Sequence, residues 1–108
     1  MKTMDKIMQG DSYGIPIAIQ TANGWATPDK FSEIEIIIGD MRKTLSSGQL
    51  TYDYVNAQFI FPLTQEETFG LSTNPQRVQV RCKFLNGEVV GQNLGNINVA
   101  PSLSRAVL

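Results

Sequence analysis

Apolar and polar residues alternate with a period of two along much of the chain, which is the pattern of half-buried β-strands. The clearest case is the segment 77–84, where four polar residues alternate with four apolar ones: Arg77, Gln79, Arg81 and Lys83 against Val78, Val80, Cys82 and Phe84. A strand of this kind has one buried face and one wet face. We therefore expect an antiparallel strand over residues 77–84.

Several other segments alternate in the same way. The positions expected to face the core are Ile15, Ile17 and Ile19; Ile34, Ile36 and Ile38; Phe59, Phe61 and Leu63; and Ile97 and Val99. A further short strand is expected at Leu50, Tyr52 and Tyr54, whose side chains also face the core. Turn residues separate these segments at Asn23-Gly24, Gly39-Asp40, Ser47-Gly48, Asn56, Asn74-Pro75 and Asn86-Gly87. Asn-Gly tolerates the positive φ angles of a type I′ turn, so Asn86-Gly87 predicts a hairpin after the strand 77–84.

Short strands between frequent turns predict a sandwich or a barrel. Thr64 and Glu67 have the spacing of a helix capping box, so one short helical turn is expected before Gly70. The predicted fold is an all-β, Ig-like antiparallel β-sandwich of about seven strands in a single domain, residues 1–108. Its core spans residues 6–99, with a short N-terminal arm (1–5) and a C-terminal arm (100–108).

Composition and charge narrow the class of function. Apolar residues make up 42% of the chain and charged residues 18%, as in a globular domain, and the net charge of −1 argues against a nucleic-acid partner. The longest apolar run, residues 36–38, is far too short to cross a membrane, and the N-terminus shows no secretory signal. We expect synthesis in a cytoplasm and no membrane or nucleic-acid partner.

Catalytic candidates are weak. The chain has no histidine and one cysteine, so the commonest general base and metal ligand are missing. Glu33 and Glu35 alternate with isoleucines and are expected on a solvated face, whereas Glu66 and Glu67 belong to the capping turn. Cys82 is expected to be a buried structural thiol. We predict no enzymatic activity, no cofactor and no metal.

Apolar residues on strand faces that should be exposed to solvent suggest an interface with a partner. They are Ile37, Ile60, Pro16 and Ala18, and in the C-terminal arm Leu103 and Val107, which share a face at their spacing. The N-terminal segment carries Met1, Met4, Ile7 and Met8, and both arms are expected to dock on neighbouring subunits. Scattered exposed apolar residues, or arms that pack on their own domain, remain open alternatives.

Two further surface features have more than one interpretation. Trp25, beside the Asn23-Gly24 turn, is a candidate for stacking on a sugar. The stripe formed by Arg77, Arg81 and Lys83 has no interleaved aromatic residues, so it suits a solubilising sheet face or half of a salt-bridged contact better than a nucleic-acid platform.

The order of the turns and strands also carries a resemblance. Gly10-Asp11 precedes the first predicted strand, Asn23-Gly24 follows it, and Leu63-Thr64-Gln65-Glu66 precedes the strand at 78–81 and the Asn86-Gly87 turn. From Lys6 to Val99 this layout resembles that of small Ig-like proteins of phages and prophages of Gram-positive bacteria. It is similar to the N-terminal sandwich of siphophage upper baseplate proteins.

The resemblance implies a non-enzymatic structural subunit of a bacteriophage particle, a tail or baseplate assembly protein that acts through protein–protein contacts. Its expected partners are other phage structural proteins and copies of itself. Its expected location is the virion, assembled in the bacterial host cytoplasm. Two alternatives remain: a capsid decoration protein, and a carbohydrate-binding adhesion module.

Overall fold

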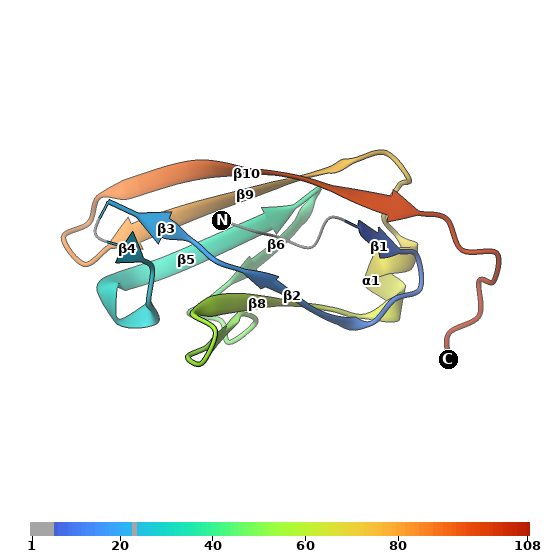
Figure 1. The fold of residues 1–108 in the computed structure, drawn as a ribbon, viewed down its shortest axis with the longest axis horizontal. Helices are drawn as coiled ribbons and strands as arrows, with labels where there is room; N and C mark the ends of the chain where they lie inside the picture. Colours follow the sequence, from blue (N-terminus) through green and yellow to red (C-terminus); the bar gives the residue numbers. More distant parts are fainter. Residues whose placement is uncertain (1–5, 23) are drawn as a thin grey trace.

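The computed structural model describes residues 6–22 and 24–108 of the chain. Two β-sheets face each other across a buried layer (Figure 1). The larger sheet has the order β1-β10-β9-β5-β6, formed by Lys6–Met8 (β1), Val89–Ala100 (β10), Gln76–Phe84 (β9), Phe31–Ile38 (β5) and Met41–Thr44 (β6). The smaller sheet has the order β2-β8-β7, formed by Tyr13–Ile17 (β2), Gln58–Leu63 (β8) and Thr51–Asp53 (β7).

Three short elements complete the fold. A two-stranded hairpin, β3 (Gln20–Thr21) with β4 (Gly24–Trp25), and a 3-10 turn, η1 (Pro28–Lys30), connect β2 to β5. A one-turn helix, α1 (Gln65–Phe69), connects β8 to β9. Asn23, half of the predicted Asn23-Gly24 turn, lies outside the described residues, as does the predicted N-terminal arm, residues 1–5.

The strand order is that of an Ig-type sandwich. In such folds the strands C, F and G form one sheet, which variable-type domains extend by C′, and B, E and D belong to the other. Here β5, β9, β10 and β6 take the places of C, F, G and C′, and β2, β8 and β7 take those of B, E and D. The predicted all-β sandwich is confirmed.

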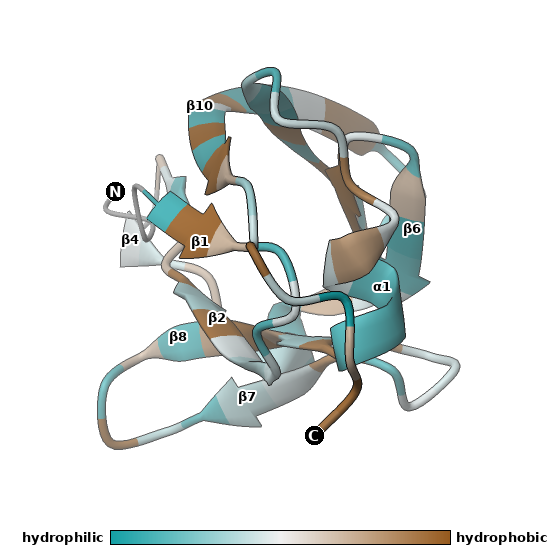
Figure 2. Cartoon of the chain, turned by 90° about the vertical axis from the view of Figure 1, so that its right-hand side faces the viewer, coloured by the Kyte–Doolittle hydropathy of each residue, from teal (hydrophilic) through white to brown (hydrophobic). Residues whose placement is uncertain are grey.

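The core lies between the two sheets and is made by the inward positions of the alternating strands. Phe59 and Phe61 of β8 are fully buried, and around them lie buried residues of the other strands, among them Ile15, Ile17, Ile34, Ile36, Ile38, Val78, Val80 and Ile97. β-branched side chains suit a pleated, buried surface because they are stiff at χ1. Figure 2, an end-on view, shows the apolar and polar bands alternating along β10.

One strand pair differs from the predicted antiparallel pattern. β1 runs parallel to the end of β10, with Lys6 opposite Asn98 and Met8 opposite Ala100. Ile7, expected in an arm that docks on neighbours, is instead 2% exposed within its own core. β1 is therefore part of the sandwich.

The predicted hairpin at Asn86-Gly87 is present, but the type I′ turn is wrong. Gly87 has φ +94°, whereas Ala57 is the only non-glycine residue of the described chain with a positive φ. The backbone N–H of Gly87 donates to the carbonyl of Phe84 at 3.0 Å, and the N–H of Phe84 donates to the carbonyl of Glu88 at 2.8 Å. The loop thus has three residues and ends in a left-handed glycine, which fits the strand twist equally well.

The capping box at α1 is confirmed. The N–H of Glu67 donates to Oγ1 of Thr64 at 3.2 Å, and the N–H of Thr64 donates to Oε1 of Glu67 at 2.9 Å. The same carboxylate pairs with Nζ of the buried Lys43 at 2.9 Å, and Lys43 also donates to the carbonyl of Pro62 at 2.6 Å. One turn of helix is thereby fastened to β6 and β8.

Tyr54 is not the core residue that the sequence pattern predicted. β7 ends at Asp53, and Tyr54 follows in the turn, where its side chain is largely exposed. Its ring packs edge-on against Tyr52, with centroids 4.8 Å apart. Asp53 accepts hydrogen bonds from the backbone N–H groups of Val55 and Asn56, and this local turn ends the strand before Tyr54.

Candidate interaction surfaces

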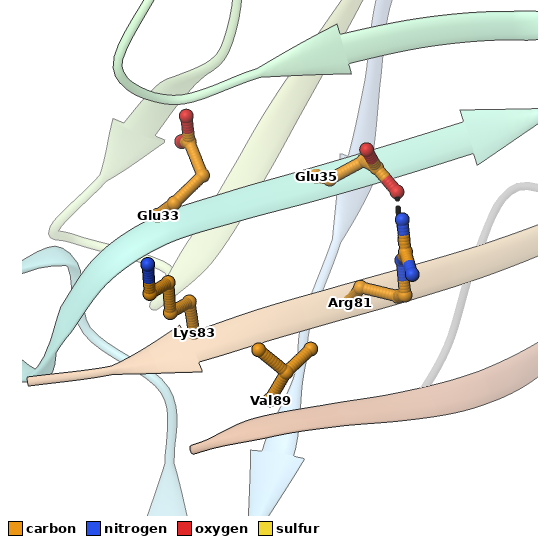
Figure 3. Close-up of a pocket in the computed structure, with 5 residues that line it drawn as sticks. All are labelled: Glu33, Glu35, Arg81, Lys83 and Val89. Atoms are coloured by element: carbon orange, nitrogen blue, oxygen red, sulfur yellow. Dashed lines mark hydrogen bonds and ion pairs between the residues drawn. The ribbon is translucent and has the colours of Figure 1, made fainter. Parts of the chain in front are cut away.

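A charged pocket lies on the outer face of the five-stranded sheet (Figure 3). Two cross-strand pairs form it, Glu33 of β5 opposite Lys83 of β9 and Glu35 opposite Arg81, and Val89 of β10 closes one side. Opposite charges placed directly across a sheet attract each other. The pocket is a candidate site because it combines charge with a hollow of about 190 Å³.

Glu35 is buried in this pocket, so its predicted place on a solvated face is wrong. Its carboxylate pairs with Nε of Arg81 at 3.1 Å and with Nε of Arg42. Both arginine side chains are more than 60% exposed, so the ion pairs lie at the surface although the carboxylate itself is buried. Burial alone raises the pKa of Glu35, but the hydrogen bonds and positive charge of the two arginines outweigh it and hold the pKa below its usual value.

Glu33 is also occupied. Its carboxylate accepts hydrogen bonds from the backbone N–H and the hydroxyl of Ser46 and from the N–H of Ile34. Burial raises its pKa, and these hydrogen bonds more than compensate, so its pKa lies below the usual value. A general acid needs a raised pKa. The pKa values of Glu33 and Glu35 are lowered instead, which indicates that these ionised carboxylates hold neighbouring parts of the chain together.

Of the predicted basic stripe, Arg81 makes a salt bridge with Glu35, and Lys83 stands opposite Glu33. Cys82, between them in sequence, points into the core and is 4% exposed. Burial raises the pKa of its thiol to about 11, so it stays protonated at neutral pH and is a poor nucleophile.

A second surface lies at the end of the molecule where the β9–β10 hairpin extends past the smaller sheet (Figure 1, left). We call it the loop-end surface. It consists of large apolar side chains, each between 44% and 70% exposed: Trp25, Leu85 and Val90, with Val89 on the outer face of the same hairpin, beside the charged pocket. Tyr54 and Val55, in the β7–β8 turn, expose further apolar area toward the same end.

The loop-end surface borders an apolar pocket of about 190 Å³, lined by Thr21, Ala22, Cys82, Phe84, Val90 and Gln92. It lies between the inner face of the projecting β9–β10 hairpin and the small β3–β4 hairpin. Nε2 of Gln92 donates to the carbonyl of Gln20 at 3.1 Å and fixes the two hairpins to each other. We call this hollow the loop-end pocket.

The predicted interface residues lie on separate faces. Pro16 of β2 stands directly opposite Ile60 of β8 on the outer face of the smaller sheet, and Ala18 follows on the same side by alternation. Ile37 lies on the outer face of the larger sheet, between Arg42 and Gln79. All four are half-buried. The structure brings Pro16 and Ile60 together and leaves Ile37 on the opposite side of the molecule.

The C-terminal arm, predicted as residues 100–108, begins at Pro101 because Ala100 is the last residue of β10. It packs along its own domain at the other end of the molecule (Figure 2). Nη1 of Arg105 donates to Oε1 of Gln9 at 3.1 Å, and its guanidinium lies 4.8 Å from the ring centroid of Phe69. The N–H of Leu108 donates to Oε1 of Gln65 at 3.0 Å. Leu103 and Val107 remain exposed.

The sequence analysis singled out Trp25 but not the rest of the loop-end surface. A usable signal was present: Val55 stands next to the Asn56 turn and Leu85 next to Asn86-Gly87. Large apolar residues beside turn residues are candidates for exposure, because connecting loops run over the protein surface.

No family model, curated protein or solved structure matches this chain. Within residues 6–22 and 24–108, no helix is long and apolar enough to span a membrane. The same residues contain no group of three or more potential metal ligands among His, Cys, Asp and Glu.

Proposed function

We propose that this chain is a non-enzymatic structural subunit of a bacteriophage particle, in the tail or baseplate, that acts through protein–protein contacts. The observation that carries the proposal is the loop-end surface, where Trp25, Leu85, Val89 and Val90 expose apolar area on one end of a rigid sandwich. Large apolar side chains exposed in one region of a surface favour an interaction site.

Two further points support the proposal. In Ig variable domains the loops at one end of the sandwich form the binding surface, and the β2–β5 and β9–β10 connections have the corresponding places here. This is an analogy of fold, and a fold alone does not assign a function. The link to a phage particle rests on the resemblance of residues 6–99 to small Ig-like phage proteins. Its partners would then be other phage structural proteins and copies of itself, in a virion assembled in the host cytoplasm.

The proposal is tested by incorporation into particles. A phage or prophage that lacks this gene is complemented with the wild-type chain, with Leu85→Asp, or with the control Thr73→Asp, which places the same charge on an exposed loop. Purified particles are separated into tails and capsids and probed by immunoblot. We expect wild type and Thr73→Asp in the tail fraction and at least tenfold less Leu85→Asp. Absence of the wild-type chain from particles would refute the proposal, and its presence in the capsid fraction would make it a decoration protein.

A carbohydrate-binding adhesion module is a second candidate, favoured by Trp25, a residue that is 46% exposed at the loop end. Aromatic faces of this kind can stack on sugar rings. A glycan array separates the two functions: binding that disappears in Trp25→Ala and survives in Leu85→Asp supports the adhesion module.

A further inference from the structure

Exposed apolar residues gather at the two ends of the long axis of the molecule, which measures 47 × 23 × 22 Å. One end has the loop-end surface and the loop-end pocket. The other has Leu103, Val107 and Leu108 of the C-terminal arm, together with Met8 of β1. One end thus has an apolar pocket, and the other has protruding apolar side chains.

The C-terminal arm is held so that it presents these side chains. Gln9, Gln65 and Phe69 contact Arg105 and the backbone of the arm, and none of these contacts uses a leucine side chain. Leu103 is fully exposed and Val107 more than half exposed. The arm is therefore ordered against its own domain with its apolar groups turned outward.

The charges of the two ends are also complementary. The loop end contains three carboxylates, those of Asp29, Asp53 and Glu88, which accept hydrogen bonds from the neutral residues Thr27, Asn56 and Asn86. One exposed cation, Lys30, follows Asp29 in η1, so the carboxylates outnumber it. Hydrogen bonds from these neighbours lower the pKa of Asp29 and Asp53, so both stay ionised at neutral pH. Arg105 is the one charged side chain of the arm, and its partners Gln9 and Phe69 are neutral.

We infer that copies of this chain associate head to tail: the C-terminal arm of one copy docks on the loop end of the next, with Leu103 in the loop-end pocket and Arg105 facing the loop-end carboxylates. The inference rests on the proposed function in taking the loop end as a protein-binding surface, and it names a second copy as the partner. A contact between two different patches is heterologous, so each added copy leaves one free arm and one free pocket. Such a contact builds rings or filaments.

Sedimentation equilibrium of the purified chain tests the inference. For wild type we expect the average mass to rise with concentration beyond twice the chain mass of 11.9 kDa. The tail variant Leu103→Asp and the pocket variant Val90→Asp should each lower the association constant at least tenfold. Thr73→Asp should behave as wild type, and circular dichroism confirms that each variant is folded. Ala22→Gln, at an exposed position lining the pocket, replaces Val90→Asp if that variant does not fold.

A mixture of the two variants gives the decisive result. Leu103→Asp retains an intact pocket and Val90→Asp an intact arm, so one productive contact remains possible between them. We expect the mixture to form a 1:1 complex that grows no further and that weakens as salt is raised from 50 mM to 500 mM, because salt screens the charge pairs.

Two outcomes would overturn the inference. One is a wild-type chain that remains monomeric at millimolar concentration. The other is a dimer that both variants abolish and that mixing does not restore, because that behaviour indicates a symmetric interface. If the chain still enters tails under either outcome, the inference fails and the proposed function stands.

Discussion

The carboxylate of Glu35 lies beneath two arginine side chains that reach over it from the neighbouring strands β6 and β9. A central strand of a sheet offers long side chains on both sides, and these can bury a charge without a second layer of backbone. The carboxylate loses water but gains two charge-assisted hydrogen bonds, which are stronger than neutral ones. Burial of this kind depends on which residues stand opposite each other across strands.

Glu35→Gln should lower the free energy of unfolding by about 1–2 kcal/mol at pH 7, because neutral hydrogen bonds replace charge-assisted ones. The folded-state pKa of Glu35 lies below its unfolded value of about 4.3. The stabilisation is therefore complete above that pH and is lost as the pH falls through the folded pKa. Urea titrations at pH 7 and pH 2.5 measure it.

Glu88→Gln is the matched control, since it removes the same charge from the exposed hairpin. A difference between wild type and Glu35→Gln that is as large at pH 2.5 as at pH 7 would contradict the role assigned to the ion pairs.

Gly14 shows a steric requirement at a single residue. A Cβ atom there would lie 2.4 Å from Cγ2 of Ile60, which stands on the adjacent strand β8. Gly14→Ala should therefore cost about 1–3 kcal/mol of stability, the usual range for overpacking. Because Ile60→Ala removes the clashing methyl, the double variant should be more stable than the sum of the two single changes predicts. Strict additivity in urea melts would contradict the clash.

At the level of elements, α1 depends on its cap. It has five residues, too few to be stable alone, so the capping box and the Lys43–Glu67 ion pair hold it. Thr64→Ala should lower the free energy of unfolding by about 1 kcal/mol, because the N–H of Glu67 loses its acceptor. Thr64→Ser retains the hydroxyl and should cost much less. Thermal melts followed by circular dichroism compare the three proteins, and equal losses in both variants would show that the methyl group matters instead.

The strands that the sequence predicts are those with one solvent-exposed face and one buried face. The segment around Val80 alternates without interruption, those around Ile15, Ile36 and Phe59 do so apart from single apolar residues on the outer face, and the structure has a strand at each. β6, with the sequence Met-Arg-Lys-Thr, was not predicted, because it is a short edge strand held by pairing with β5. The burial of Glu35 was missed for a related reason: strand register brings Arg42 and Arg81 beside it, and alternation does not specify register.

At the scale of the whole molecule, the sandwich is elongated and its exposed apolar residues lie at its two ends. The sequence analysis found Leu103 and Val107 at one end and Trp25 at the other, but treated them as unrelated. The loop-end pocket could not be predicted from the sequence, because it arises from the different lengths of the two sheets. Such a difference appears only when the strands have been paired and stacked.

Deletion of Pro101–Leu108 should leave the domain folded while abolishing its incorporation into particles. The arm is held by a few hydrogen bonds, exposed or part-buried, and by one cation–π contact, so we expect a loss of about 1–2 kcal/mol in urea melts. Particles complemented with the truncated chain are probed by immunoblot. Unfolding of the truncated protein, or its normal incorporation, would show that the arm is not an assembly device.

The parallel pairing of β1 with the end of β10 has a mechanical consequence. A force that pulls Lys6 and Ala100 apart draws the two strands in opposite directions along their length, because both run the same way. The inter-strand hydrogen bonds, together with the bond from the N–H of Gln9 to the carbonyl of Ala100, are then loaded at the same time in shear. An antiparallel pair pulled from one end would instead open one bond at a time. Tension between these two points therefore acts on all the bonds between β1 and β10 together, and not on one bond after another.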